Sequence, residues 1–422
     1  MGVRDRGYID PMLILHTSDW HLGRTFHGVD ILDVQAQAMA EIVEWVRHHG
    51  VSAVLVSGDV YDRAQPRTEV VELLSTTLAQ IREAGAYVIL TSGNHDSPAR
   101  LGFGSGIMSH GGVHLLTRVP DAHVPVLLSQ STDSTITVAR ATAPPAPDPR
   151  GATLSGAFTV AVYGIPYIEP RAAAPSLDCA PTHQAVLGTV MERIDVDRKE
   201  RGDIPSVVMA HAFVTGAQPT DPERVVDSGG LGTVPAEVFA RHDYTALGHI
   251  HRRQRVADAV RYSGSPVAYS FSEAGHPKGA WLVDVQETGV HEVTGLDHAA
   301  RMDLACLRGT LDELLRDPAH TSAEGAWCQV VLTDRDRPAS AMDRIRTRFP
   351  RTVELRWEPE GGRTLTQQAY SARVAEAAGA EELCAQFYDH VRHRGLSGPE
   401  QDEIADAVAA AVVALGLPAA PV

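Results

Sequence analysis

Five short segments of the chain share one design, in which an apolar run, often followed by glycine, ends in aspartate, asparagine or histidine. They are Ser18–His21 (SDWH), Ser57–Asp62 (SGDVYD), Ser92–Asp96 (SGNHD), Ala210–His211 (AH) and Gly248–His251 (GHIH). Imidazole and carboxylate together are ligands that suit manganese, iron or zinc better than magnesium. One such segment means little, but five in a single chain exceed what chance would give. The pattern predicts a transition-metal centre.

The spacing within these segments suits two neighbouring ions. Asp19 and His21 lie two residues apart, as do His249 and His251, and side chains two apart in extended backbone point to the same side. Two ions held about 3.5–4 Å apart need a bridging carboxylate, and Asp59 is the expected bridge. Two divalent ions bring four positive charges against two from Asp19 and Asp59, so the pocket is expected to be locally positive.

The elements around these segments predict how they come together. Strands are expected at Met12–Thr17, Ala53–Val56 and Tyr87–Leu90, separated by helices at Ile31–His48 and Glu69–Glu83. This βαβαβ order is typical of an α/β sandwich with mostly parallel central strands. In such sheets the carboxyl ends of the strands converge on one crevice. A later run of strands, from about residue 159 to 293, predicts a second sheet facing the first.

Length and character divide the chain into three parts. The 422 residues exceed one compact core. We expect a catalytic domain over 1–298, a small α/β unit over 299–364 and a helical region over 365–422. The helical region is expected to contain Gln367–Ala378, Glu381–His393 and Pro399–Leu415. Ala141–Gly151 is proline-rich and predicts an exposed loop.

The composition limits which partners and which cellular compartment are expected for the chain. The net charge of −16 argues against coating nucleic acid through the overall field, so positive charge must be local or come from metal ions. No apolar run approaches the ~18–20 residues of a membrane span, and no P-loop is found. The four cysteines form no CxxC motif. A reduced, cytoplasmic setting without membrane contact is predicted.

The motifs DWHLG, SGDVYD, SGNHD and GHIH, together with His211, resemble the calcineurin-like metallophosphoesterase superfamily. The segments HLGRTFHG, YGIPY and YSGSP are similar to the SbcD nuclease family within it. The resemblance in motifs covers Leu15 to about Pro266. Beyond Pro266 the chain matches the family in the arrangement of its regions more than in individual residues. It implies a calcineurin-like β-sandwich flanked by helices, followed by a small α/β capping domain and a C-terminal helical region.

The resemblance also implies roles for the motif residues. One of two divalent ions, most simply Mn²⁺, would be held by Asp19, His21, Asp59 and His251. The other would be held by Asp59, Asn94, His211 and His249. His95 resembles the acid that stabilises charge or protonates the leaving oxygen, and Asp96 is expected to orient it. Asp62 stands where archaeal and eukaryotic relatives place a second histidine, so that role is not transferred.

The implied reaction is hydrolysis of DNA phosphodiesters. The family acts as an exonuclease on double-stranded ends and as an endonuclease on single strands and hairpins, in DNA end processing, recombination and repair. It works with an SbcC-type ATPase, which agrees with the missing P-loop. Direct homodimerisation is left open.

Peripheral residues carry two further hypotheses. Arg252, Arg253 and Arg255 follow the last ligand pair and could position DNA phosphates, or could only solvate the next turn. In the tail Leu383, Phe387 and Val391 lie four apart on one helix face and could dock the ATPase, or could complete their own domain. A small-molecule phosphodiesterase or phosphatase on the same two-metal scaffold, and a scaffold without chemistry, remain the competing interpretations.

Overall fold

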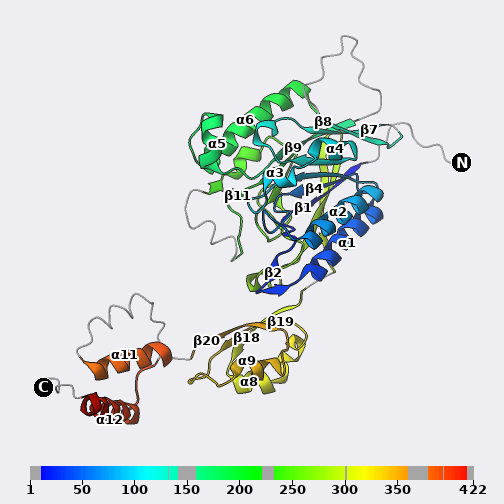
Figure 1. Cartoon of the computed structure of the whole chain (residues 1–422). Helices are drawn as coiled ribbons and strands as arrows, with labels where there is room; N and C mark the ends of the chain where they lie inside the picture. The colour runs from blue at the N-terminus through cyan, green and yellow to red at the C-terminus, as the bar shows by residue number, and fades with distance from the viewer. Residues whose placement is uncertain are drawn as a thin grey trace, which may run out of the picture. The chain divides into compact units, whose positions relative to one another are not determined.

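The computed structural model describes residues 11–131, 133–140, 158–220, 232–299, 302–359, 379–392 and 394–415. The expected loop at Ala141–Gly151 and the expected helix at Gln367–Ala378 lie outside the described residues. The chain separates into two compact units, Met1–Met302 and Asp303–Val422 (Figure 1). The finer division of the second unit near residue 365 stays a prediction. None of the described helices has the length and apolar character needed to cross a membrane.

The first sheet of the first unit has six strands. In spatial order they are β17 (Gly289–Asp297), β16 (Gly279–Gln286), β1 (Met12–Thr17), β4 (Ala53–Ser57), β5 (Tyr87–Thr91) and β6 (Val113–Leu116). The last four are parallel neighbours, while β16 runs antiparallel to β1. Helices α1 (Leu32–His49) and α2 (Thr68–Glu83) connect β1 to β4 and β4 to β5. All five residues of β4 are buried, as expected for a parallel strand covered on both faces.

The second sheet has seven strands. In spatial order they are β14 (Gln254–Arg255), β15 (Val260–Tyr262), β13 (Tyr244–Gly248), β10 (Ser206–His211), β9 (Phe158–Ile165), β7 (Val126–Gln130) and β8 (Ile136–Arg140). Its centre, from β9 to β15, is parallel. Helices α5 (Pro170–Leu177) and α6 (His183–Arg201) lie in the connection from β9 to β10.

Shorter elements complete the unit. They are β2 (Thr25–Phe26), β3 (Val29–Asp30), α3 (Pro98–Leu101), α4 (Ser105–His110), β11 (Phe213–Val214) and β12 (Thr233–Val234), with 3₁₀ turns at Val119–Asp121, Ala236–Phe239 and Phe271–Glu273.

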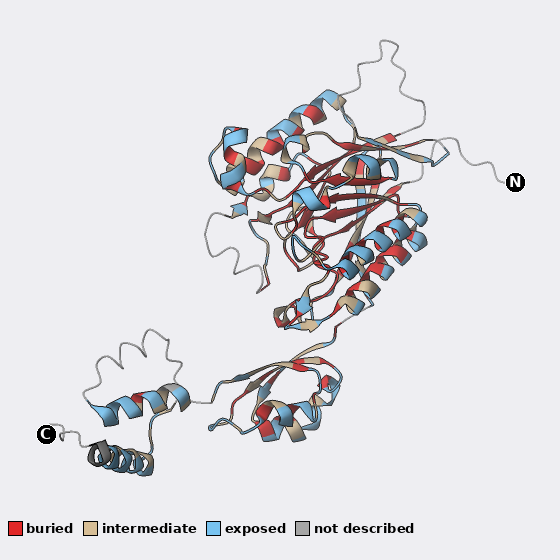
Figure 2. Cartoon of the chain, in the orientation of Figure 1, coloured by how far each residue is buried: buried red, intermediate tan, exposed pale blue. Residues whose placement is uncertain are grey.

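The two sheets pack face to face. One buried cluster takes Ile14 and Leu55 from the first sheet together with Val160 and Met209 from the second. Another lies between the second sheet and helices α5 and α6. In Figure 2 the strands at the middle of the unit are the most continuously buried part, and helices cover the outside. The expected α/β sandwich flanked by helices is therefore confirmed.

A buried histidine joins the two sheets. His16 of β1 is fully buried, with Nε2 at 3.1 Å from the Leu247 carbonyl and Nδ1 at 2.9 Å from the Tyr244 hydroxyl, both on β13. The carbonyl can only accept, so Nε2 donates and Nδ1 accepts from the hydroxyl. Burial lowers the pKa of His16 to about 3. The ring is therefore neutral in the folded protein at every pH above that value.

This link predicts a pH-dependent stability. Because the pKa of His16 is about 3 when folded and near 6.5 when unfolded, the unfolded chain binds the extra proton, and stability is lost as pH falls below 6.5. Between pH 7 and pH 5 the loss from this group is about 2 kcal/mol. Urea denaturation at the two pH values should show a smaller difference for His16→Gln than for wild type. The exposed His48 on α1 provides the control, since His48→Gln should keep the wild-type difference.

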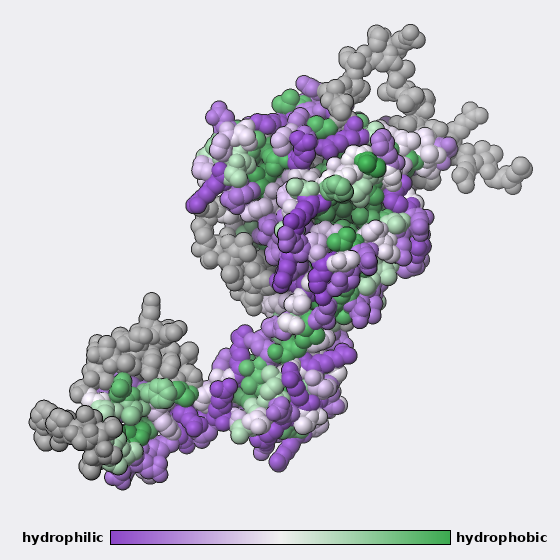
Figure 3. All heavy atoms as spheres, viewed as in Figure 1, coloured by the Kyte–Doolittle hydropathy of each residue, from purple (hydrophilic) through white to green (hydrophobic). Residues whose placement is uncertain are grey.

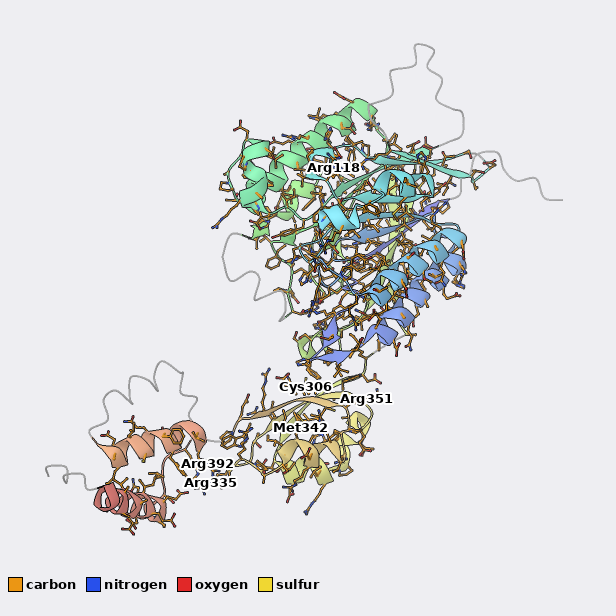
Figure 4. The ribbon with its side chains drawn as sticks, in the orientation of Figure 1. Arg118, Cys306, Arg335, Met342, Arg351 and Arg392 are labelled. Atoms are coloured by element: carbon orange, nitrogen blue, oxygen red, sulfur yellow. The ribbon has the colours of Figure 1, made fainter. Side chains whose placement is uncertain are left out.

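The second unit begins with a small parallel sheet of β18 (Leu304–Gly309), β19 (Trp327–Leu332) and β20 (Thr352–Trp357). Helices α8 (Leu311–Arg316) and α9 (Ala341–Arg346), with a 3₁₀ turn at Pro318–Ala323, accompany it. Val330 and Ile345 belong to its core. Figure 4 labels Arg351, whose guanidinium lies over the Trp327 ring, and the exposed Cys306 on β18. The four cysteines are free thiols.

Two helices follow, α11 (Ala380–Arg392) and α12 (Gly398–Leu415). Glu400 links them, because its carboxylate accepts two hydrogen bonds of 2.8 Å from Arg394 and one from the Tyr388 hydroxyl of α11. These helices agree with the expected Glu381–His393 and Pro399–Leu415 to within one or two residues.

Candidate metal centre

The five chemistry-bearing segments follow the carboxyl ends of strands in both sheets. In the first sheet β1 leads to Asp19 and His21, β4 to Asp59, and β5 to Asn94 and His95. In the second sheet β10 ends in His211, and β13 leads to His249 and His251. Because these strands are parallel within each sheet and the sheets are packed together, all the segments meet at one edge of the sandwich.

One half of the centre gathers around His21. Its Nε2 lies 3.1 Å from Nε2 of His251 and 3.4 Å from Oδ2 of Asp59. Potential ligand atoms of Asp19, His21 and His251 all lie within 4.8 Å of one another. Asp19 is held in place by the Ser18 hydroxyl at 2.5 Å and by the backbone N–H of His249 at 2.9 Å.

The other half gathers around Asn94. Its Oδ1 lies 3.0 Å from Nε2 of His211 and 3.2 Å from Nδ1 of His249. Nδ1 of His211 donates to the Ser57 carbonyl at 2.9 Å, which directs Nε2 toward the centre. The same Oδ2 of Asp59 that approaches His21 lies 3.3 Å from Nε2 of His211. Asp59 therefore lies between the two halves, as the bridging carboxylate predicted from sequence would.

The backbone around these groups fits metal ligation. Asp19, His21, Asp59 and His249 have φ of 51°, 41°, 49° and 103°, which makes half of the eight described non-glycine residues with positive φ candidate ligands. Backbone of this kind costs about 1–3 kcal/mol per residue and gathers at functional sites.

Glycines make the close approach possible. A Cβ on Gly58 would collide with Nδ1 of His211, one on Gly93 with Oδ1 of Asp59, and one on Gly248 with the Ser57 carbonyl. The glycines of the motifs are thus required by the space that the donors occupy, and the donor set suits two divalent transition-metal ions.

The protonation states suit the same chemistry. Burial lowers the pKa of His249 to about 3 and holds that of His21 well below its usual value, so both rings are in the neutral form that binds metals. Burial opposes charge on His211, but the Asp59 carboxylate outweighs it and raises the pKa to about 9. Metal binding is therefore expected to displace a proton from His211 at neutral pH.

His95 lies beside the centre and is one-third exposed. Its backbone N–H donates to Oδ1 of Asp59 at 2.9 Å, and its ring lies edge-on to His21 with centroids 4.7 Å apart. Nδ1 lies 2.9 Å from the Asp62 carbonyl and is placed to donate to it. The ring is therefore oriented by a backbone oxygen, and its Nε2 remains for substrate.

The role expected for Asp96 is corrected by its contacts. Both carboxylate oxygens accept from backbone N–H groups, those of Val60 at 3.0 Å, Tyr61 at 2.9 Å and Gly93 at 2.9 Å. Asp96 thus joins the loops after β4 and β5, where Asp59 and Asn94 are placed, and does not hold the His95 ring. Periodicity alone could not distinguish a carboxylate facing a ring from one facing three amides.

Asp62 proves to be part of the site through both its groups. Besides the carbonyl that meets His95, its carboxylate lies 3.6 Å from Nδ1 of His21 and 3.5 Å from the Arg24 guanidinium. The carboxylate thus lies behind a candidate ligand, near its ring but beyond hydrogen-bonding distance.

Two supporting residues were missed by the sequence interpretation. Gln35 on α1 is fully buried and donates to the His21 carbonyl at 2.8 Å and to the Tyr269 hydroxyl at 3.0 Å. Tyr269 in turn donates to the Trp20 carbonyl. A signal existed, because Gln35 is a polar residue on the helix face that otherwise buries Ala38, Met39 and Ile42.

The three arginines after the last ligand pair have separate roles. Arg253 is built into the first sheet, where it donates to the Leu296 carbonyl at 2.7 Å and pairs with Asp297, and its side chain is only 10% exposed. These contacts give the Arg253 guanidinium a structural role within the first unit, and its contact with DNA stays a prediction. Arg252 donates to Gln218 at 2.6 Å and Arg255 pairs with Asp258, both at the surface.

Exposed apolar side chains of the described residues gather in two main places. Leu383, Phe387 and Val391 on α11 are 42%, 57% and 46% exposed. In the first unit Phe103 and Ile107 are still more exposed, beside a hollow of about 370 Å³ between α2 and β6. Figure 3 shows apolar residues at the surface of both units.

Two solved structures are similar to part of this chain. A dimetal phosphatase from Danio rerio matches 69% of this chain and 100% of its own at 14% identity, with a TM-score of 0.38. The calcineurin-like phosphoesterase YfkN from Bacillus subtilis matches 69% of this chain and 91% of its own at 13% identity, with a TM-score of 0.37.

A closer relative in sequence is the SbcD subunit of the nuclease SbcCD from Bacillus subtilis (strain 168). It is 32% identical over 281 residues, which span 65% of this chain and 66% of that protein, slightly less than two thirds of its length.

Two family models match the chain. The C-terminal one, described as the type 5 capsule protein repressor C-terminal domain, covers residues 301–392. The N-terminal one, described as calcineurin-like phosphoesterase, covers residues 12–253, more than half of the chain and all the segments that form the centre. The resemblance drawn from the motifs is thereby confirmed, and the chain belongs to the calcineurin-like phosphoesterase family.

Proposed function

We propose that the chain is a metal-dependent DNA nuclease of the SbcD type, acting as an exonuclease on double-stranded ends and as an endonuclease on single strands and hairpins. The observation that carries the proposal is the convergence of donors from both sheets on Asp59, with His95 beside them. The relative from Bacillus subtilis, named as part of a nuclease, supports a nucleic acid as substrate.

The residues of the centre are assigned two roles, metal binding and proton donation. Two divalent ions, for which Mn²⁺ is our choice, would be held by Asp19, His21, Asp59 and His251, and by Asp59, Asn94, His211 and His249. When bound, such ions polarise a phosphate and activate water. His95 would donate a proton to the departing sugar oxygen, and the Asp62 carbonyl stabilises the N–H on the other side of its ring.

The function is tested with the full chain, Mn²⁺ and a DNA hairpin, with the ATPase partner present and absent. Cleavage of the hairpin is expected. Hydrolysis of p-nitrophenyl phosphate esters without any cleavage of DNA would instead support a small-molecule phosphodiesterase. A protein that binds no manganese, iron or zinc, and whose stability a chelator leaves unchanged, would be a scaffold.

We further propose that the α11 face formed by Leu383, Phe387 and Val391 docks an SbcC-type ATPase. These three side chains are spaced by four residues, so they form one apolar stripe, and exposed stripes of this kind mark docking sites. The proposal rests on the nuclease assignment and on the absence of a P-loop from the sequence.

Deleting residues 383–422 is expected to abolish copurification with the ATPase while leaving the metal content unchanged, since every candidate ligand lies in the first unit. The triple variant Leu383→Ser, Phe387→Ser, Val391→Ser should reproduce the loss, and Cys384→Ser, at another exposed position of α11, should not. Copurification of the truncated chain would refute the docking site.

Homodimerisation and a cytoplasmic location stay predictions. A second copy of the chain could cover the exposed Phe103 and Ile107, and analytical ultracentrifugation measures whether one does.

A further inference from the structure

A recess opens beside His249, on the side of the centre that holds Asn94 and His211. Its volume is about 310 Å³, at the lower end of the range for small-molecule pockets. Tyr167, His183 and Phe213 line it together with His249. Tyr167 follows β9, His183 opens α6 and Phe213 opens β11, so three separate segments place rings in one recess.

The rings that line the recess adjoin the imidazole rings of the metal centre. The His249 and His211 rings lie 5.2 Å apart. From there Phe213 lies 6.4 Å from His249, and Tyr167 lies 6.3 Å from His211 and 5.9 Å from His183. All five rings are half-buried or buried, and the Tyr167 backbone is anchored by a 2.7 Å hydrogen bond to the Ser92 carbonyl. A planar group entering the recess would meet ring faces and edges next to the reacting phosphate.

The side chains that line the recess offer a phosphate no cationic partner. Among the described residues, no arginine or lysine lines it, and its one ionised lining side chain is the carboxylate of Glu169. Glu169 is near enough to Tyr167 to add to the effect of burial in raising the pKa of that hydroxyl. The hydroxyl stays protonated, while the carboxylate would repel a backbone phosphate and accept hydrogen bonds from amino groups.

We propose that this recess is a nucleobase subsite, in which one unpaired base next to the scissile phosphate lies against Tyr167 and Phe213 and presents its edge to Glu169. The proposal rests on the proposed nuclease function and names what that site recognises. A base can enter only when it is outside the double helix. The subsite therefore favours single strands, frayed ends and hairpin loops, and adds stacking that every base can provide.

The subsite is tested by measuring cleavage of single-stranded oligonucleotides that each carry one abasic residue. In this series the abasic residue occupies, in turn, each of the three positions on either side of the cut. Wild type is expected to lose about 10- to 100-fold in kcat/KM at one position and little at the others. Tyr167→Ala should lose a similar factor on the intact strand and nothing further on the strand abasic at that position. Tyr167→Phe, which keeps the ring, should retain the loss that the abasic residue causes at that position.

A binding measurement separates the subsite from the chemistry. Without metal, in EDTA, 2-aminopurine at the sensitive position should lose fluorescence on binding to wild type and to Tyr167→Phe, but not to Tyr167→Ala. If wild type cuts no DNA at all, the nuclease proposal fails, and 2-aminopurine stepped through a bound single strand still tests the subsite. Absence of quenching at every position, or an equal loss by Tyr167→Ala on intact and abasic strands, would overturn the subsite.

Discussion

Replacing His95 with alanine is expected to lower DNA cleavage by about 10²- to 10⁴-fold and to leave the metal content near that of wild type. The factor is the usual contribution of a positioned acid or base. His95 lies against His21 and is one-third exposed, and its Nδ1 is engaged by the Asp62 carbonyl, so the ring offers one nitrogen to a substrate. Hairpin cleavage and metal analysis by mass spectrometry, made on the same preparation, measure the two quantities.

The metal content decides between two roles. One nitrogen of His95 lies within 4.8 Å of ligand atoms from His21 and Asp59, so the ring could also be a ligand. Loss of one metal equivalent in His95→Ala would make it one, and the acid role would be wrong. His110→Ala removes an exposed imidazole at the end of α4 and should change neither quantity.

Replacing Gly93 with alanine is expected to remove metal binding and activity together. The new methyl group would occupy the position of the Asp59 carboxylate, colliding with both its Oδ1 and its backbone nitrogen. Asp59 cannot move away freely, because it approaches both His21 and His211. Titration calorimetry with Mn²⁺ should show at least a 100-fold weaker affinity, which corresponds to about 2.7 kcal/mol.

Gly106→Ala is the matched control. Gly106 lies in α4, is exposed and has open space where the methyl group would go. This variant should bind metal as wild type does. Normal metal binding by Gly93→Ala would show that the loops after β4 and β5 can separate, and the cage around Asp59 would then be looser than its contacts indicate.

The sequence predicted most of the fold, because strands and helices follow from local patterns. The motifs and their resemblance to a known family named the candidate donors, which the structure brings close together. The strands before Asp19, Asp59 and Asn94 are continuous apolar runs, and the parallel arrangement brings their ends together. The donors could therefore be named before their distances were known.

The sequence did not predict the hydrogen-bond partners of side chains that can reach several different groups. Asp96 was expected to face a ring and instead accepts from three backbone amides, a choice that depends on loop geometry. Arg253 lies two residues after the candidate ligand His251, yet its side chain donates to backbone carbonyls of β16 and β17. A partner 43 residues away in the chain leaves no trace in the local pattern.

The cross-chain origin of the donors has a consequence for how the protein matures on the ribosome. The first sheet provides Asp19, His21, Asp59 and Asn94, whereas every donor from the second sheet is an imidazole, the earliest being His211. A nascent chain thus displays its oxygen donors and His21 long before the other three imidazoles emerge, and β16, which pairs with β1, comes later still. A complete set of donors therefore exists only when most of the first unit has been synthesised, so an unfinished chain cannot assemble the metal centre.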